Sequence, residues 1–397
     1  MAVWELIKEN SRMIYRPLGK SGISAGIIGL GGEYLEGQEQ KIAVDVIHAA
    51  MDAGVNMLDI FMSEPEIRTN IGVALKGRRE KMFIQGQVGS AWLDGQYTKT
   101  RDLKECKFFT EDLFTRLQTD YIDIGMIHYC DSEEDLKLLE GNGIIDYCLD
   151  LKKQGRFRTL GIGSHNSTIA KQLVNLDIFD VLMFSINPAM DMIYNHYTID
   201  GFFETTDESK EDGVAKGRID IDQERVELYN LCEAKGVGIT VMKTLGGGRL
   251  LSAESSPFKI PMTVAQCIHY ALSRPAVASV LIGAKSVDEM NQSLAYLEAS
   301  EKEKDYSSIF GNIEEYQENS CLYCNHCLPC PANINIAAVT KLLDQAKAIG
   351  LNDKLKAEYA MLFTNAGDCI ACGICEGRCP FGVTIVANMK EAVRIFG

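Results

Sequence analysis

The alternation of apolar and amphipathic segments along the chain limits most strongly what this sequence can fold into. Eight short apolar segments, each typical of a strand buried on both faces, lie at residues 25–30, 55–60, 82–87, 123–128, 159–164, 181–185, 237–242 and 279–283. Helical patterns lie between them, at residues 40–53, 66–77, 101–118, 143–154, 222–235 and 286–297. This alternation predicts an α/β protein with a (β/α)8 TIM barrel. No GxGxxG motif follows the first apolar segment, which disfavours a doubly wound dinucleotide-binding sheet.

The cysteines predict a second, smaller domain. The chain has 13 cysteines, and the last eight form two dense runs that each end in Cys-Pro. Three closely spaced thiolates of such a run ligate one [4Fe–4S] cluster, and the fourth ligates the other cluster. We therefore assign Cys321, Cys324, Cys327 and Cys379 to cluster 1, and Cys369, Cys372, Cys375 and Cys330 to cluster 2. Zinc is the alternative, but its four-cysteine sites usually consist of two separated pairs.

These patterns divide the chain into three parts. We expect a barrel over residues 1–300, a polar linker over 301–320, and a ferredoxin-like, partly helical iron–sulfur domain over 321–397. The long stretch 187–221 interrupts the alternation and is expected to form a functional or solvated loop.

Composition excludes several classes of protein. The 397 residues carry a net charge of -15, and an acidic chain without a basic block is a poor ligand for nucleic acids. No apolar run approaches the roughly 18 residues of a membrane span. The charged N-terminus does not resemble a secretory signal. Reduced, metal-ligating cysteines then predict a cytoplasmic protein that binds neither membranes nor nucleic acids.

Several segments resemble signatures of a known family. They are YRPLGKSGISAGIIGLGG, DAGVNMLDI, TDYIDIGMIH, GIGSHN and VLIGAKS. Over residues 14–297 the chain is similar to the aldo-keto reductases, which implies a (β/α)8 barrel and an oxidoreductase. Together with the cysteine runs, it resembles an aldo-keto reductase fused to a ferredoxin-type domain with two [4Fe–4S] clusters.

The resemblance also implies a catalytic site at the carboxyl ends of the strands. The family reduces carbonyls with a nicotinamide cofactor, using a Tyr acid, a Lys that lowers the pKa of this Tyr, an Asp and a His. Asp59 and His128 stand at the Asp and His positions, whereas Glu64 replaces the Tyr and Gln87 replaces the Lys. This departure puts the ordinary mechanism in doubt.

Another group must then donate the proton. Glu64 is the first candidate, because a nearby Asp59 carboxylate would raise its pKa. Tyr34, in the loop after the first strand, is the second candidate. A hard metal ion held by Asp59, Glu64 and His128 is a further alternative. Trp92 and Tyr97 are expected in the loop after the third strand, where they could line a substrate pocket.

The cofactor pocket of the family is partly kept. The residues expected to bind NAD(P)H, or another phosphate-bearing cofactor such as a flavin, are Ser164, Asn166, Lys243, Gly283, Lys285 and Ser286. The N-terminus of the last barrel helix suits a phosphate. The usual Glu-Asn pair near the adenine is replaced by Gln292 and Ser293.

Three functions are compatible with these features. The favoured hypothesis is an iron–sulfur-dependent reductase that reduces a small organic substrate at the barrel rim, with a ferredoxin or flavodoxin as electron donor. The second is an NAD(P)H-dependent carbonyl reductase with structural clusters. The third is an inactive barrel that serves as an electron-transfer or interaction scaffold.

Overall fold

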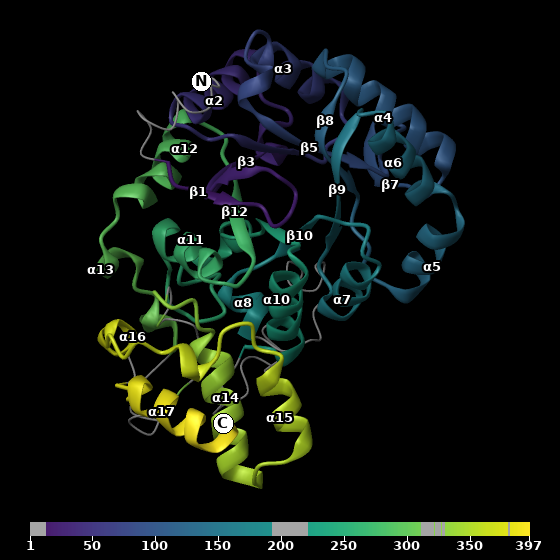
Figure 1. Cartoon of the computed structure of the whole chain (residues 1–397). Helices are drawn as coiled ribbons and strands as arrows, with labels where there is room; N and C mark the ends of the chain where they lie inside the picture. The colour runs from purple at the N-terminus through teal and green to yellow at the C-terminus, as the bar shows by residue number, and fades with distance from the viewer. Residues whose placement is uncertain (1–12, 193–220, 311–320, 322–326, 328–329, 380–381) are drawn as a thin grey trace, which may run out of the picture.

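Eight parallel strands close into a barrel. The computed structural model describes residues 13–192, 221–310, 321, 327, 330–379 and 382–397 (Figure 1). The barrel has the order β10-β11-β12-β3-β4-β5-β8-β9. Its strands are β3 (Ile28–Gly31), β4 (Met57–Ile60), β5 (Phe83–Val88), β8 (Ile122–Ile127), β9 (Phe157–Ser164), β10 (Val181–Ser185), β11 (Gly238–Met242) and β12 (Val277–Gly283). The predicted α/β TIM barrel is confirmed, and each predicted apolar segment overlaps one of these strands.

Helices surround the barrel and bury one apolar face each against it. The helices of this layer are α2 (Gln40–Asp52), α3 (Pro65–Leu75), α4 (Leu103–Leu117), α5 (Glu133–Gly141), α6 (Ile144–Lys153), α7 (Ser167–Asn175), α8 (Pro188–Met192), α10 (Gln223–Lys235), α11 (Val264–Leu272) and α12 (Val287–Leu294). Side-chain caps fix where several of them begin. Asp102, for example, accepts the backbone N–H groups of Lys104 and Glu105 at the start of α4.

An N-terminal hairpin closes the barrel at the amino ends of the strands. It pairs β1 (Tyr15–Pro17) with β2 (Ser24–Gly26). Its tip inserts Leu18 into the barrel interior, in the same apolar cluster as Met57 and Ile124. The backbone N–H of Gly26 donates to Asn56 Oδ1 at 2.7 Å, which joins the hairpin to the start of β4. In the described part of the chain, the barrel is therefore closed at the amino ends of its strands and open at their carboxyl ends.

A second hairpin rises from the open end. Residues after β5, expected to form a loop, instead pair as β6 (Ser90–Leu93) and β7 (Gln96–Lys99). Asp94 and Gly95 form the two-residue turn, with φ of 52° and 77°. Such a turn matches the twist of the flanking strands, and Asp-Gly favours it. This hairpin places Tyr97 above the barrel.

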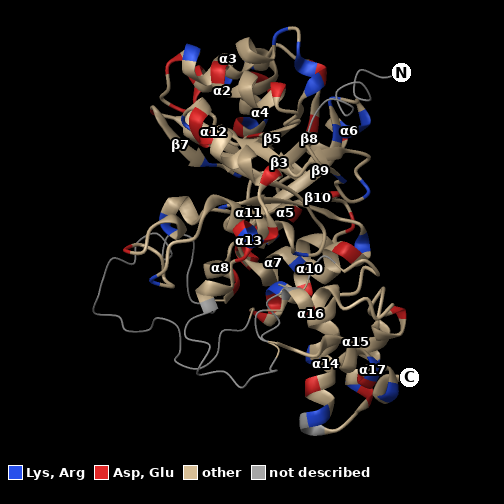
Figure 2. Ribbon diagram, turned by 90° about the vertical axis from the view of Figure 1, so that its left-hand side faces the viewer, with Lys and Arg blue, Asp and Glu red and all other residues tan. Residues whose placement is uncertain are grey.

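The C-terminal part is a small helical domain. Its helices are α14 (Ile336–Ile349), α15 (Asp353–Ala360), α16 (Ile374–Arg378) and α17 (Ile385–Phe396). The rings of Tyr359 and Phe396 stack with centroids 4.3 Å apart, and Lys347 pairs with Glu391 at 2.7 Å. In Figures 1 and 2 this domain lies beside α10. Asn335 Nδ2 donates to Asn230 Oδ1 at 2.8 Å, so α14 is joined directly to α10.

The first half of the predicted linker packs on the barrel. Helix α13 (Glu301–Lys304) contacts α11, and Tyr306 is fully buried with its ring 5.2 Å from that of Tyr270. Buried side chains of the barrel and of the helical domain form one continuous apolar cluster. The two parts therefore share a core.

The surface and the helix lengths agree with the composition. In Figure 2, segments with Lys or Arg alternate with segments with Asp or Glu along the helices. No helix in the described ranges has the length and apolar character that a membrane span requires.

Candidate active site and cysteine site

One large cavity opens at the carboxyl ends of the strands. Its volume is about 1240 Å³, and residues from all eight strands or the turns after them line it. In (β/α)8 enzymes this end of the barrel carries the catalytic residues. Asp59, Gln87 and His128 all line the cavity. The structure thus brings together three of the four residues predicted as catalytic.

A chain of hydrogen bonds joins these residues to a tyrosine. Gln87 Nε2 donates to Asp59 Oδ1 at 2.9 Å, and Gln87 Oε1 contacts His128 Nδ1. His128 Nε2 lies 2.5 Å from the hydroxyl oxygen of Tyr97. Gln85 Nε2 also donates to Asp59 Oδ1, at 2.8 Å. The Gln87 amide therefore bridges Asp59 and His128.

Burial changes the acidity of both ends of this bridge. Asp59 is 2% exposed, and its burial raises the pKa of its carboxyl to about 7, against the opposing effect of hydrogen bonds from Gln87 and Gln85. Burial also lowers the pKa of His128 well below its usual range, and the charge of Arg101 acts in the same direction. His128 is therefore a neutral imidazole at neutral pH.

Glu64 lies at the start of α3, where it caps the helix. Its Oε2 accepts the backbone N–H of Ile67 at 2.6 Å, and Glu64 is not among the residues that line the cavity. The like charge that contributes to the raised pKa of Asp59 comes from Glu33. The expected pairing of Glu64 with Asp59 is thus replaced by a pairing with Glu33.

Tyr34, the second candidate acid, lines the opposite side of the cavity. It belongs to a short 3-10 helix, Gly32–Leu35, and its ring lies against Gly283. Lys285 Nζ is 5.2 Å from the centre of this ring. Burial raises the pKa of the Tyr34 hydroxyl, as do the charges of Glu33 and Glu289.

The geometry does not support the hard-metal alternative. In the described part of the chain, no three His, Cys, Asp or Glu side chains converge as the ligands of a single metal ion. Asp59 and His128 are instead separated by the Gln87 amide, which contacts both.

The predicted cofactor residues at the end of β9 are partly engaged within the protein. Ser164 Oγ donates to Asp131 at 3.1 Å and does not line the cavity. Asn166 lines it, but its Oδ1 caps α7 by accepting the N–H groups of Thr168 and Ile169. His165 also lines the cavity and pairs with Asp131 at 2.7 Å.

The other predicted cofactor residues surround the far side of the cavity. Lys243, Gly283 and Lys285 line it, and Lys243 Nζ lies 3.8 Å from Glu33. Ser286 caps α12, and Glu289 Oε2 accepts the backbone N–H of Lys285 at 2.7 Å. A carboxylate of the helix itself therefore stands where the predicted phosphate would bind.

Four cysteines surround one small apolar cavity in the C-terminal domain. They are Cys330, Cys369, Cys372 and Cys375, the set assigned to cluster 2. The cavity is about 20 Å³ and is otherwise lined mainly by apolar residues such as Ile334, Ile385 and Met389. The backbone N–H of Ala371 donates to Cys369 Sγ at 3.4 Å. Four thiols in an apolar shell with an N–H···S contact are the donor set that a [4Fe–4S] cluster requires, although no three of them converge on one point as the ligands of a single ion would.

The cluster 1 residues are described in part. Cys327 is buried, and Cys321 and Cys379 are half-buried. Cys324 lies outside the described residues.

Comparison with known proteins agrees with this architecture. A model of the Aldo/keto reductase family matches residues 22–263, which is more than half of the chain. The chain belongs to the aldo/keto reductase family. A model of the 4Fe-4S dicluster domain matches residues 320–384. This aldo/keto reductase therefore carries an iron–sulfur domain, and both the predicted family and the C-terminal domain are confirmed.

Relatives of this aldo/keto reductase include two proteins of Bacillus subtilis. The uncharacterized oxidoreductase YqkF is 25% identical over 293 residues, which are 70% of this chain and 89% of YqkF. The aldo-keto reductase YhdN is 27% identical over 168 residues, which are 38% of this chain and 47% of YhdN.

Solved structures support the fold. The holo form of aldo-keto reductase AKR11C1 from Bacillus halodurans matches with a TM-score of 0.56 and 23% identity, over 74% of this chain and 94% of that one. PA4992 from Pseudomonas aeruginosa matches with a TM-score of 0.54 and 20% identity, over 74% and 97%.

Two residues of the site were not predicted as catalytic from the sequence. Gln85 lies two residues before Gln87 on β5, and the two-residue period of a strand could have placed both on one face. The Asp94-Gly95 pair could have indicated the hairpin that carries Tyr97. Neither pattern indicates that the Tyr97 hydroxyl reaches His128.

Proposed function

We propose that this protein is an iron–sulfur-dependent reductase of a small organic substrate, which binds at the barrel rim beside Asp59, Gln87 and His128. One observation carries the proposal: cysteines from both runs surround a single apolar cavity. Cys330, Cys369, Cys372 and Cys375 would hold one [4Fe–4S] cluster, and Cys321, Cys324, Cys327 and Cys379 a second. Such clusters supply single electrons at potentials tuned by burial and by hydrogen bonds to sulfur.

The barrel residues support a site that differs from that of an ordinary carbonyl reductase. Gln87 is a neutral amide at the position of the family's Lys, so no cation at this position lowers the pKa of a phenol. His128 and Tyr97 offer a nitrogen and a hydroxyl at the wall of the cavity. Phe61, Met183 and Leu281 add apolar surface. This combination suits an organic substrate with one polar oxygen.

The proposal also names a partner and a location. A small acidic one-electron carrier, such as a ferredoxin or flavodoxin, would reduce the C-terminal domain. Thiolate-ligated clusters persist in reducing compartments, which supports a cytoplasmic location for the proposed reaction.

Anaerobic turnover with two different electron sources tests the proposal. The holoprotein is supplied either with dithionite-reduced methyl viologen or with NADPH, and product is measured for benzaldehyde and cinnamyl alcohol as probes. We expect product only with the viologen, and a loss of at least about 10-fold in Cys375→Ala, since a missing ligand breaks the electron path. Cys267→Ala, which removes a buried thiol from α11 of the barrel, is the matched control and keeps activity. Equal NADPH-dependent turnover in wild type and Cys375→Ala would contradict the proposal.

One observation favours a second candidate, a nicotinamide-dependent carbonyl reductase with structural clusters. The cavity of about 1240 Å³ is lined by Asp59 and also by Gln292 and Ser293 of α12, so it has the volume for a large ligand such as a dinucleotide. The residues that would bind it are Asn166, Lys243, Gly283, Lys285 and Ser286, with Ser164 behind them. The same viologen and NADPH experiment separates the two candidates. A flavin in the same cavity would be detected by its absorption in the anaerobically purified protein.

A further inference from the structure

We propose that Tyr97 is the catalytic proton donor of the barrel site. Gln87 is a positioning residue whose side-chain amide rotates by half a turn, exchanging its oxygen and its NH2 group, when Asp59 becomes protonated. The inference deepens the proposed function, because it names the acid of the same site and the state in which that acid is available. It replaces Glu64 and Tyr34 in this role.

The polarity of the hydrogen-bond chain follows from the ionised form of Asp59. A carboxylate only accepts, so Gln87 presents its NH2 group to Asp59 and its carbonyl oxygen to His128. An amide oxygen also only accepts, so the single proton of the neutral imidazole is on Nδ1. His128 Nε2 is then bare and accepts the hydroxyl proton of Tyr97 across 2.5 Å. In this state the proton of Tyr97 is held by His128 and is withheld from the cavity.

Protonation of Asp59 reverses the chain. The proton is added to Oδ1, the oxygen that faces Gln87, and this O–H donates to the Gln87 carbonyl while Oδ1 still accepts from Gln85. The Gln87 carbonyl then turns toward Asp59, and its NH2 group turns toward His128 Nδ1. The imidazole proton is then on Nε2 and points at the Tyr97 oxygen. The hydroxyl proton of Tyr97 is no longer accepted by His128 and points toward the cavity side, which it shares with its hydrogen-bond partner Tyr129. This second state can donate a proton and can also stabilise the phenolate that remains.

Neighbouring contacts confine the movement to one side chain. Gln85 donates to Asp59 at 2.8 Å and accepts from Thr240 Oγ1 at 3.1 Å, so both ends of its amide are held. Gln87 is held only within the chain itself and by a weak 3.6 Å contact to Met183 Sδ. A turn of the Gln87 amide exchanges groups of similar size and needs no change of backbone.

Burial, modified by neighbouring groups, sets the pH at which the chain reverses. Burial raises the pKa of the Asp59 carboxyl to about 7, with a smaller contribution from Glu33 and against hydrogen bonds from Gln87 and Gln85. Burial lowers the pKa of His128, as do Arg101, Lys99 and His165, whereas Asp131 opposes them. Burial also raises the pKa of Tyr97, as do Tyr129 and Glu33 against the charge of Arg101, and this keeps the phenol protonated. The change near neutral pH is therefore a change of tautomer in a neutral imidazole.

The hairpin delivers Tyr97 to the place where an acid is needed. Tyr97 is 40% exposed, yet its ring lies 5.6 Å from that of Phe61, which stacks on His128. Beyond Tyr97, Lys99 and Arg101 both pair with Asp135, at 2.9 and 2.7 Å. Arg101 also donates to the backbone oxygens of His128 and Tyr129. The hydroxyl is thus positioned from a hairpin and not from the start of α3, where Glu64 lies.

The chemical step is one balanced proton transfer. The O–H bond of Tyr97 breaks, and an O–H bond forms on the substrate oxygen as this oxygen gains electron density from the one-electron donor of the proposed function. The phenolate accepts the Nε2 proton of His128 in a hydrogen bond. Water at the open mouth of the cavity returns the proton to Tyr97.

Nitrogen-15 NMR of the histidine-labelled holoprotein tests the switch without any substrate. His128 is assigned with His128→Gln, and its tautomer is read at pH 5.5 and pH 8.5. We expect proton on Nε2 at the lower pH and on Nδ1 at the higher pH, with a neutral ring at both. In Asp59→Asn and Gln87→Met the tautomer should no longer depend on pH. A single tautomer throughout, or an imidazolium at pH 5.5, would overturn the switch.

Turnover tests the role of Tyr97 separately. With reduced methyl viologen as electron source and the probes above as substrates, the turnover rate of Tyr97→Phe should be about 100- to 10,000-fold below that of the wild type, which is the usual contribution of a general acid. Tyr121→Phe is the matched control, because its ring lies over Arg79 at the other end of the barrel. Unchanged turnover in Tyr97→Phe would refute the assignment and return the role to Glu64 or Tyr34. If the tautomer reverses as expected but the viologen supports no turnover, the proposed function fails and the switch stands.

Discussion

The carboxylate of Glu64 accepts the backbone N–H of Ile67 at 2.6 Å and so serves as the N-cap of helix α3. Loss of an N-cap side chain costs about 0.5–2 kcal/mol. Glu64→Ala should therefore lower the apparent Tm. Glu64→Asp should lower it much less, because Asp is a preferred N-cap residue. Thermal unfolding monitored by circular dichroism measures this. If Glu64→Gln abolishes turnover while the Tm is unchanged, Glu64 has a chemical role that its capping contact does not explain.

The buried Asp59 predicts that stability falls as pH rises. Its folded-state pKa of about 7 lies above the ordinary value of 3.8, so the folded state binds the extra proton. This protonation stabilises the fold fully below about pH 4, and the stabilisation is lost as the pH rises through 7. The free energy of unfolding falls by about 4 kcal/mol over this range, because a pKa shift of one unit corresponds to about 1.36 kcal/mol. Asp59→Asn should raise the apparent Tm at pH 8 and change it little at pH 4. The opposite order would show that the ionised carboxylate is stabilised in the fold.

The cavity lined by Cys330 and Cys375 predicts that replacing either cysteine, although they belong to different runs, has the same effect on iron content. Cys330→Ala and Cys375→Ala should each remove cluster 2, so iron should fall from about eight to about four atoms per chain. Because cluster binding contributes folding energy, the helical domain should also become sensitive to protease. Iron and sulfide analysis after anaerobic purification measures this, with Cys148→Ala as control. Zinc without sulfide in the wild-type protein would contradict the assignment.

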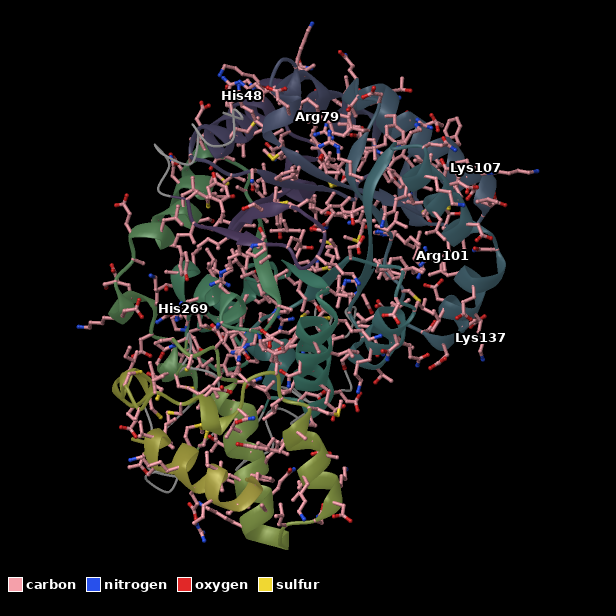
Figure 3. The ribbon with its side chains drawn as sticks, viewed as in Figure 1. His48, Arg79, Arg101, Lys107, Lys137 and His269 are labelled. Atoms are coloured by element: carbon pink, nitrogen blue, oxygen red, sulfur yellow. The ribbon has the colours of Figure 1, made fainter. Side chains whose placement is uncertain are left out.

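The positive charge of Arg101 near His128 leads to a prediction about the pKa of the His128 imidazole. This charge lowers the pKa of the imidazole, so Arg101→Met should raise that pKa and let the imidazolium form at a higher pH. Lys107 of α4, which is labelled with Arg101 in Figure 3, lies over the ring of Tyr147 of α6. The control variant is therefore Lys107→Met. A proton NMR titration of the histidines measures both. An equal shift in the two variants would point to a general change of charge.

The barrel could be predicted because its strands are buried on both faces, and such strands read as continuous apolar runs. Residues 123–128 and 181–185 are examples, and they correspond to β8 and β10 within one residue at each end. Asp59 and His128 could be placed at the open end because each stands at a strand end. The grouping of Cys330 with Cys369, Cys372 and Cys375 around one cavity could be predicted from the Cys-Pro ending of the first run, and their role as cluster ligands stays a prediction.

The hydrogen-bond partners of the side chains in the candidate site could not be predicted from the sequence pattern. Sequence position put Glu64 five residues beyond Asp59, yet Glu64 is the N-cap of a helix that begins at Pro65, and its carboxylate turns toward Ile67. Tyr97 is ten residues from Gln87, and only the pairing of β6 with β7 brings its hydroxyl to His128. Such contacts depend on tertiary geometry, which a local pattern does not contain.

The N-terminal hairpin has a kinetic consequence. Because Leu18 and its neighbours fill the amino end of the barrel, a molecule at Asp59 has only the opposite end through which to leave. Substrate, product and any dinucleotide must share that single entrance. Their arrivals and departures should then be ordered, with the innermost molecule the first to enter and the last to leave. Product inhibition patterns in steady-state kinetics would reveal this order.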